Sequence, residues 1–219
     1  MALKATFYPD LPFKNLYIPH IYKEIYFDKI YTDVFKNKKD MVIIDVGANI
    51  GIVTRFMRDF AKVVYAIEPS PENFEALKKN VEFNKWDNVV PLNFAITDKD
   101  GKANFNIWLK NRTGNSLVYD FGGGKNRKVV EVDTKRLDTF FAENNIKEVD
   151  FVKLDVEGAE DMILYSDGFK NIVNKIKAIM VELHFARSDK PRVNRLIQHI
   201  LGFGFKEKKC AEIISLFTR

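Results

Sequence analysis

The sequence contains only one cysteine, Cys210, among its 219 residues. A single cysteine excludes an internal disulfide and a zinc site built from several thiolates. No stretch approaches the roughly 18 uncharged apolar residues of a membrane-spanning helix. The first residues also lack the apolar core of a secretory signal. Together these absences predict a cytoplasmic protein that does not associate with a membrane.

Acidic residues are fewer than basic ones, so the net charge is +5 and the pI about 9.1. Such a balance can indicate nucleic-acid binding. However, the basic clusters at 36–39, 124–128 and 206–209 are short and scattered. Short charge runs are typical of solvated surfaces. We therefore expect a small-molecule partner rather than a nucleic acid.

Short apolar segments alternate with helix-like segments along most of the chain. The expected strands are 42–45, 63–68, 89–97, 149–155 and 178–185, and residues 204–219 are typical of two further strands joined by a turn. Strands that alternate with helices indicate βαβ units and a parallel sheet. Residues 101–133 interrupt the alternation with two β segments that flank a loop. The sequence thus predicts a doubly wound, Rossmann-like α/β fold with an inserted β-hairpin.

Capping residues and aromatic content add detail at the level of single elements. Ser70 is expected to cap a helix that has Pro71 in its first position, and Ser188 to cap a later helix that Gly202 ends. Residues 1–40 are rich in tyrosine, and 21–35 resembles a helix with apolar faces. We expect this extension to pack on the core or to act as a lid over a domain spanning 41–219.

The segment "MVIIDVGANIGIVTRFM" (41–57) runs from a short strand through a glycine turn into a helix. In open α/β sheets, ligands bind beyond the carboxyl ends of the strands. Asp45, Gly47, Asn49 and Gly51 would lie there, where glycine lets the backbone approach a ligand closely. Glu68 ends the next strand, and an acid at that position can accept both hydroxyls of a ribose.

Two nucleotide-like cofactors compete for this loop. A dinucleotide site needs the pattern G-x-G-x-x-G, so that backbone amides meet the pyrophosphate. Here Asn49 replaces the second glycine. S-adenosylmethionine has a ribose, an ammonium and a sulfonium but no phosphate, so an acid at position 45 suits it. The loop therefore favours S-adenosylmethionine over NAD.

Four segments of the sequence resemble the FkbM family of S-adenosylmethionine-dependent methyltransferases. They are "DVGANIG" (45–51), "EPSPENFEALKKN" (68–80), "AITDKDG" (95–101) and "FVKLDVEGAE" (151–160). The resemblance implies the class I methyltransferase fold, with a seven-stranded, mostly parallel sheet whose last strand is antiparallel. It also implies methyl transfer to a hydroxyl oxygen of a sugar, a polyketide or another small molecule. Thr97 departs from the serine that is commoner in the family.

The resemblance further implies which residues hold the cofactor. The set expected at its methionine end and ribose is Asp45, Gly47, Asn49, Gly51, Glu68, Pro69 and Ser70. Asp98 is the candidate for the adenine amino group, although an acid in "TDKDG" can equally be a turn residue.

Acidic residues gather where the fourth and fifth strands are expected to end. Asp155, Glu157 and Glu160 follow one strand, and Glu182 and His184 would share a face of the other. Since the two strands should be neighbours, Asp155, Glu157, Glu182 and His184 are predicted to converge as catalytic residues. His184 is the candidate general base, with a structural hydrogen bond to Glu182 as the alternative. Asp155 is a base, a cofactor contact or a helix cap.

Several readings of this acidic region stay open at this point. Oxygen ligands with one imidazole would suit Mg²⁺ or Mn²⁺, but carboxylates also bind cationic ligands directly, so we assign no metal ligands. In the loop 111–128, Arg112, Asn115, Ser116 and Tyr119 are candidate acceptor contacts or part of a hairpin tip.

The alternative functions are an RNA methyltransferase of the same fold, an NAD-dependent oxidoreductase, and a protein that binds the cofactor without catalysis.

Overall fold

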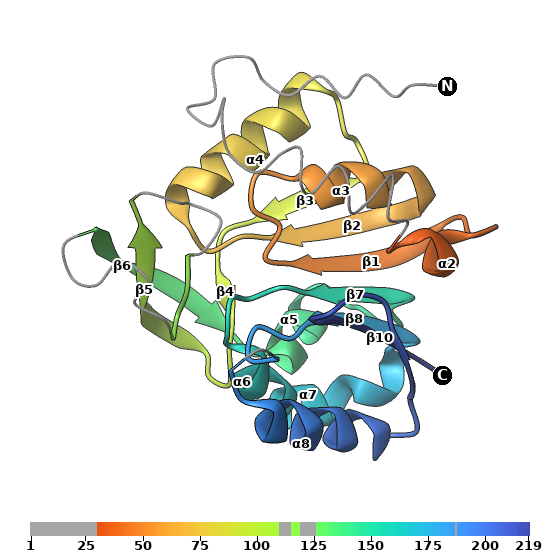
Figure 1. The fold of residues 1–219 in the computed structure, drawn as a ribbon. Coiled ribbons are helices and arrows are strands. Elements are labelled where there is room, and N and C mark those ends of the chain that lie inside the picture. The colour runs from red at the N-terminus through yellow and green to blue at the C-terminus, as the bar shows by residue number, and fades with distance from the viewer. Residues whose placement is uncertain (1–29, 110–114, 119–125, 187) are drawn as a thin grey trace.

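A computed structural model of the chain describes residues 30–109, 115–118, 126–186 and 188–219 (Figure 1). Its larger sheet has seven strands in the order β3-β2-β1-β7-β8-β10-β9. These are β1 (Met41–Val46), β2 (Ala61–Ile67), β3 (Val89–Leu92), β7 (Phe151–Leu154), β8 (Ala178–Glu182), β9 (Lys206–Lys209) and β10 (Ile214–Thr218). Neighbours from β3 to β8 are parallel, whereas β10 runs antiparallel to both β8 and β9. The predicted mostly parallel sheet with an antiparallel last strand is confirmed.

Helices cover both faces of this sheet (Figure 1). One face carries α2 (Thr32–Phe35), α3 (Ile52–Met57), η2 (Arg58–Phe60) and α4 (Pro71–Phe83), and the other carries α5 (Leu137–Glu143), α6 (Glu160–Leu164), α7 (Asp167–Ile172), η3 (Val173–Lys175) and α8 (Lys190–Leu201). Successive strand residues point to opposite faces. Accordingly, Ile43 packs in the core on the α3 side and Ile44 in the core on the α8 side. The fold is doubly wound, as predicted.

A second, three-stranded sheet holds the insertion. Its strands are β4 (Ala95–Ile96), β5 (Gly101–Trp108) and β6 (Arg127–Lys135). The pair β5–β6 is antiparallel, which confirms the predicted hairpin. The expectation of one strand over 89–97 is wrong, because β3 ends at Leu92 and β4 joins β6 instead. The side-chain Nδ2 of Asn93 donates a 2.8 Å hydrogen bond to the backbone carbonyl of Glu68 at this change of sheet.

The fifth predicted strand is shorter than expected. The sequence predicts a strand over 178–185, but β8 ends at Glu182 and the chain then turns. The amide of Ala186 donates to the carbonyl of Leu183 at 2.9 Å, which replaces sheet pairing by a local turn. His184 therefore lies in a turn just beyond the strand end, where its ring is not held to strand alternation.

The predicted helix caps are partly confirmed. Ser70 accepts a hydrogen bond from the amide of Asn73 and begins α4, with Pro71 in the first position. Gly202 follows the end of α8 as expected. The predicted cap at Ser188 is wrong, because the carboxylate of Asp189 accepts the 2.9 Å hydrogen bond from the amide of Arg192. A carboxylate is the stronger acceptor at a helix start, where the dipole is positive.

The strand order reverses between β1 and β7. The chain proceeds from β1 to β2 and β3 on one side, and later to β7 and β8 on the other. The carboxyl ends of β1 and β7 thus diverge into loops that lead to opposite faces of the sheet. Such a switch point is where open α/β sheets bind their ligands. It is also where the glycine segment and the acidic residues meet.

Residues 30–35 are continuous with the core beside β1. Tyr31 and Phe35 are buried, and the Phe35 ring lies 5.6, 5.1 and 5.1 Å from those of Phe56, Phe60 and Phe151. The predicted helix over 21–35 lies mostly outside the described residues, as do the tyrosines before residue 30. The boundary at residue 40 and the lid therefore stay predictions. No helix in the described part of the chain is long and apolar enough to cross a membrane.

Removing the Phe35 ring should destabilise the whole domain. The side chain is only 2% exposed and fills the space between three other rings. We expect Phe35→Ala to lower the free energy of unfolding by about 3–5 kcal/mol. Leu109→Ala, at a side chain that is 53% exposed, is the control and should change it by less than about 0.5 kcal/mol. Urea unfolding measures both, and equal effects would show that Phe35 is not part of the core.

Candidate active site

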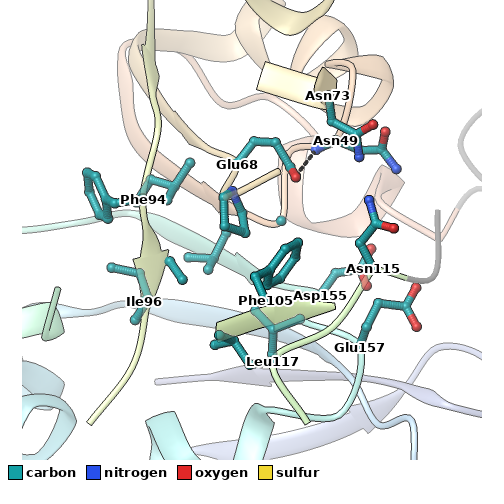
Figure 2. Close-up of a pocket in the computed structure, with 16 residues that line it drawn as sticks. Asn49, Glu68, Asn73, Phe94, Ile96, Phe105, Asn115, Leu117, Asp155 and Glu157 are labelled. Carbon is teal, nitrogen blue, oxygen red and sulfur yellow. Dashed lines mark hydrogen bonds between the residues drawn. The ribbon is translucent and has the colours of Figure 1, made fainter. Parts of the chain in front are cut away.

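A cavity opens at the carboxyl ends of β1, β2 and β7 (Figure 2). Parts of the chain that are far apart in sequence build it: the turn after β1, the end of β2, strands β4 and β5, the segment 115–117 and the turn after β7. Its lining residues are Val46, Gly47, Asn49, Ile67, Glu68, Pro69, Asn73, Phe94, Ala95, Ile96, Phe105, Asn115, Leu117, Asp155, Val156 and Glu157. The inserted hairpin thus forms one wall of the site.

Gly47 allows the turns after β1 and β7 to touch. Its φ is +82°, and a Cβ there would lie 1.8 Å from the backbone oxygen of Asp155. No side chain fits such a contact, so glycine is required on steric grounds as well as conformational ones. This contact brings Asp155 to the edge of the cavity next to the glycine turn.

Gly51 is not among the residues that line the cavity, and its predicted contact with the cofactor stays a prediction. Its φ is +93°, and a Cβ would meet Leu77 Cδ1 at 2.8 Å and the Trp86 ring at 3.3 Å. It does not line the cavity but lets α3 begin close against α4. The loop glycine therefore serves helix packing, which the sequence pattern alone does not distinguish from ligand contact.

Glu68 lies at the floor of the cavity with its carboxylate held by backbone. Its Oε2 accepts a hydrogen bond from the amide of Asn49 at 2.8 Å (Figure 2), and its Oε1 accepts one from the amide of Ser70 at 2.9 Å. Burial raises the pKa of Glu68 to about 7, although both amide hydrogen bonds act in the opposite direction. The carboxylate is fixed in place and retains lone pairs for hydroxyl donors.

The two ends of the cavity differ in polarity. Figure 2 shows Phe94 and Ile96 at one end, and Asn49, Asn115 and Glu157 at the other. The Asn115 side chain is 8% exposed, and its Nδ2 has no hydrogen-bond partner among the described residues. Its Oδ1 accepts from the amide of Trp108 at 2.9 Å, which orients the side chain. The cavity thus offers a flat apolar slot and, opposite, an unused buried donor.

A buried lysine lies beneath the cavity. The Nζ of Lys153 is 3.0 Å from Asp155 Oδ2, 3.5 Å from Asp45 Oδ1 and 3.3 Å from the carbonyl oxygen of Gly47. Burial alone would lower the pKa of Lys153, but the charges of Asp155 and Asp45 raise it overall. Lys153 is therefore an ammonium that neutralises two neighbouring acids. Asp45, fully buried and bonded by the Thr54 hydroxyl at 2.6 Å, supports the site from below and does not line the cavity.

The predicted catalytic residues converge beside the cavity. The Nε2 atom of His184 lies 3.3 Å from Glu157 Oε2, 3.7 Å from Asp155 Oδ1 and 3.7 Å from Glu182 Oε1. On the other side of the ring, Nδ1 donates to Oε1 of Glu160 at 2.6 Å. The sequence places Glu160 near the site without a role, whereas the structure makes it the residue that orients the imidazole.

The crowding of charges shifts the pKa values of His184, Glu157, Glu182 and Asp155. Burial alone would lower the pKa of His184, but the hydrogen bond with Glu160 and the nearby acids raise it to about 10. Burial and the charge of Asp155 raise the pKa of Glu157 to about 8. The charge of Asp155 and then burial raise that of Glu182 to about 8. Asp155 itself is held below its usual pKa by Lys153 and His184, against the effect of burial.

The remaining predicted residues divide into two groups. Pro69 lines the cavity, and Ser70 is buried beside it and contributes its amide to Glu68. Asp98 is exposed and is not among the lining residues, so the geometry gives no support to its contact with an adenine. Asp155 does not cap α6, which begins after Ala159 without a side-chain cap. Arg112 and Tyr119 lie outside the described residues.

Sequence reasoning did not identify the apolar wall. Ile96 and Phe105 lie in strands of the second sheet, and Phe94 comes directly before β4. A single strand over 89–97 would place Phe94 and Ile96 in the main sheet. Their only sequence signal is apolar character next to "TDKDG". Asn115, a candidate acceptor contact, lies on the cavity wall, and its contact with an acceptor stays a prediction.

Because of the close contact at Gly47, adding one methyl group there should strongly destabilise the protein. Gly47→Ala should unfold the turn or displace Asp155, because a Cβ has no space there. Gly204→Ala is the matched control: its φ is +85° but no atom lies within 4 Å of a Cβ. We expect Gly204→Ala to cost about 1–2 kcal/mol and Gly47→Ala clearly more, measured by thermal unfolding. Equal losses would mean that backbone conformation alone demands glycine at position 47.

Comparisons with known proteins agree with this geometry. A sequence model of the methyltransferase FkbM domain matches residues 45–207. Methyltransferase 1 of Beauveria bassiana is 31% identical over 172 residues, which cover 70% of this chain and 68% of that protein. The 2-O-methyltransferase NoeI of Sinorhizobium fredii is 27% identical over 161 residues, which cover 66% of this chain and 64% of that protein. The similarity therefore spans about two thirds of each of these curated relatives.

Two solved structures share the fold. The methyltransferase FkbM of Methylobacillus flagellatus KT superposes with a TM-score of 0.56 at 15% identity, covering 88% of this chain and 47% of that one. A precorrin-6y C5,15-methyltransferase of Geobacter metallireducens gives a TM-score of 0.50 at 12% identity, covering 98% and 93%. Given the family match across most of its length, the chain belongs to the FkbM family of methyltransferases.

Proposed function

We propose that this protein transfers a methyl group from S-adenosylmethionine to a hydroxyl oxygen of a small hydroxylated molecule. The observation that carries the proposal is the cavity at the ends of β1, β2 and β7, with Glu68 fixed on its floor and four carboxylates beside it. NoeI, a 2-O-methyltransferase by name, supports the choice of oxygen as the atom that is methylated.

The residues of the cavity fit the cofactor group by group. An adenine fits between Phe94, Ile96 and Phe105, and the two ribose hydroxyls can donate to Glu68. The unused Nδ2 donor of Asn115 faces the other end, where it can bind the carboxylate of the methionine part. The acids at that end suit an ammonium and a sulfonium.

The same residues fit a dinucleotide poorly. The amide of Asn49 donates to Glu68, the amides of Gly47 and Ala48 donate to the carbonyl of Ile67, and that of Gly51 donates to the carbonyl of Ala48. A pyrophosphate needs such amides free at the start of the helix. A polyanion such as RNA would also meet Asp155 and Glu157 at the cavity edge. These contacts argue against the NAD and RNA alternatives.

The chemistry of the transfer divides between cofactor and protein. When bound, the cofactor supplies a methyl on a positive sulfur; the C–S bond breaks as the new C–O bond forms, and sulfur keeps the electron pair. The protein orients the two partners in line and provides a carboxylate for the hydroxyl proton. We place that role in the set Asp155, Glu157 and Glu182. His184, predicted as a base, has its Nε2 directed at three carboxylates and is better suited to hold them in position.

Transfer from methyl-labelled S-adenosylmethionine tests the proposal. The acceptors are a panel of monosaccharides, glycosides and hydroxylated polyketides, with bulk RNA and a carboxylic acid series as rivals. We expect the label in a base-stable methyl ether of one class of hydroxylated acceptor. Label in RNA alone, or only in base-labile methyl esters, would contradict hydroxyl methylation.

Protonation of Glu68 should weaken cofactor binding. A neutral carboxyl group accepts hydroxyl donors less well than a carboxylate, and the pKa of Glu68 is about 7. Binding is therefore strongest above pH 7 and falls below it, by roughly thirtyfold at pH 5.5 relative to pH 8. Calorimetric titration with S-adenosylhomocysteine measures this dependence. Glu68→Gln should bind weakly at both pH values, whereas the exposed Glu75→Gln should keep the wild-type profile; a pH-independent wild type would remove Glu68 from the ribose site.

Asn115 should distinguish the methionine part of the cofactor from its nucleoside part. Asn115→Asp keeps the Oδ1 acceptor used by Trp108 but replaces the free donor by a negative charge. We expect it to weaken S-adenosylhomocysteine binding by roughly tenfold or more while changing the affinity for 5′-methylthioadenosine, which lacks the carboxylate, only a few-fold. Equal losses for both ligands would place Asn115 at the nucleoside instead.

A further inference from the structure

The negative charge beside the cofactor cavity exceeds the positive charge around it. Among the described residues, Asp155, Glu157, Glu160 and Glu182 all lie within 3.7 Å of one imidazole, that of His184. In the described part of the chain, the basic groups that contact these acids are the His184 imidazole and the Lys153 ammonium, which is shared between Asp155 and Asp45. Grouped carboxylates repel one another unless a further positive charge lies between them.

Glu160 provides an independent sign of an unmet positive charge. Its side chain is fully buried, and its Oε2 has no hydrogen-bond partner in the part of the chain that the structure describes. Oε1 of the same carboxylate accepts hydrogen bonds from His184 Nδ1 at 2.6 Å and from the amide of Gly158 at 3.1 Å, so the unpaired Oε2 belongs to the group that holds the imidazole. An ionised carboxylate is costly to bury with one oxygen unsatisfied.

The atoms around Nε2 have the spacing of metal ligands. Single atoms of Asp155, Glu157 and His184 all lie within 4.8 Å of one another. For bonds of about 2.1 Å, neighbouring ligands of an octahedral ion are about 3 Å apart and opposite ones about 4.2 Å. The separations of 3.3 Å from Nε2 to Glu157 and 3.7 Å to Asp155 fall between these limits. The contact of Nδ1 with Glu160 directs Nε2 at the site, as acids behind metal-binding histidines do.

We propose that Asp155, Glu157 and His184 bind one divalent cation, Mg²⁺ or Mn²⁺, at the edge of the cofactor cavity. Two carboxylates and one imidazole match the preferences of these ions better than those of structural zinc, which takes thiolates and imidazoles in a closed shell. The cation takes the position of the Nε2 proton. Glu182 Oε1 is also 3.7 Å from Nε2, but Glu182 does not belong to the group of atoms that all lie within 4.8 Å of one another, so we leave it outside the ligand set.

The cation would define the class of acceptor. An ion with open positions can hold two adjacent oxygens of one molecule and lower the pKa of the hydroxyl that it binds. The preferred acceptor then carries a hydroxyl next to a second oxygen, as in a vicinal diol. This part of the inference rests on the proposed function, whereas the cation site itself does not.

Titration of the chelator-treated protein with Mn²⁺, followed by the electron paramagnetic resonance signal of the free ion, tests the site. We expect one Mn²⁺ per chain, displaced by excess Mg²⁺. His184→Ala and Glu157→Gln should each weaken binding roughly tenfold or more, as loss of a ligand does. Glu182→Gln should weaken it only a few-fold, and the exposed Glu148→Gln should leave it unchanged.

Three results would overturn the cation site: no Mn²⁺ binding, equal binding by wild type and His184→Ala, or an equal loss in Glu182→Gln and Glu157→Gln. The last would indicate diffuse attraction to acidic groups and not a built site. Titration of the same samples with S-adenosylhomocysteine separates the two proposals. If the protein binds S-adenosylhomocysteine but does not bind Mn²⁺, only the cation site is refuted. If it binds Mn²⁺ but does not bind S-adenosylhomocysteine, only the cofactor assignment is refuted.

Discussion

The contact between the turns after β1 and β7 is the constraint on which the rest of the site depends. The Asp155 backbone oxygen occupies the space of a side chain at Gly47, so the two turns meet without a gap. This contact places Asp45 and Asp155 on either side of the Lys153 ammonium. Loss of this ammonium would leave the two acidic side chains close together without a counter-charge, which is strongly destabilising at buried positions. Lys153 thus lets the protein hold acids at a cavity edge where a cationic cofactor group is expected.

Most of the fold follows from local patterns in the sequence. Apolar strands separated by amphipathic segments are enough to predict a doubly wound parallel sheet, and the two terminal β segments predict the antiparallel strand β10. The errors lie at boundaries that tertiary partners decide. The strand expected over 89–97 divides because the chain leaves β2 after Leu92 and pairs with β6. The cap predicted at Ser188 lies at Asp189, since neighbouring polar residues compete for the same helix start.

The candidate site is predictable in its members but less so in their roles. Glu68, Gly47 and Asn49 reach the cavity as the glycine segment indicates. Gly51 packs against α4. A glycine needed for helix packing and a glycine that contacts a ligand cannot be distinguished from the sequence alone. His184 lies beside the acidic residues, as predicted. Its contact with Glu160 depends on where α6 begins, which the hydrophobic pattern of the sequence does not indicate. The apolar wall formed by the insertion could not be predicted without knowing which strands pair in the second sheet.

The central claim is that the cavity binds S-adenosylmethionine through a ribose-binding acid and without a phosphate cradle. Calorimetric titration of the purified protein with S-adenosylhomocysteine, with NAD in a parallel titration, tests it most directly. We expect saturable binding of S-adenosylhomocysteine at one site per chain and no heat of binding with NAD. Binding of NAD in preference to S-adenosylhomocysteine would contradict it and would make the glycine turn a dinucleotide site.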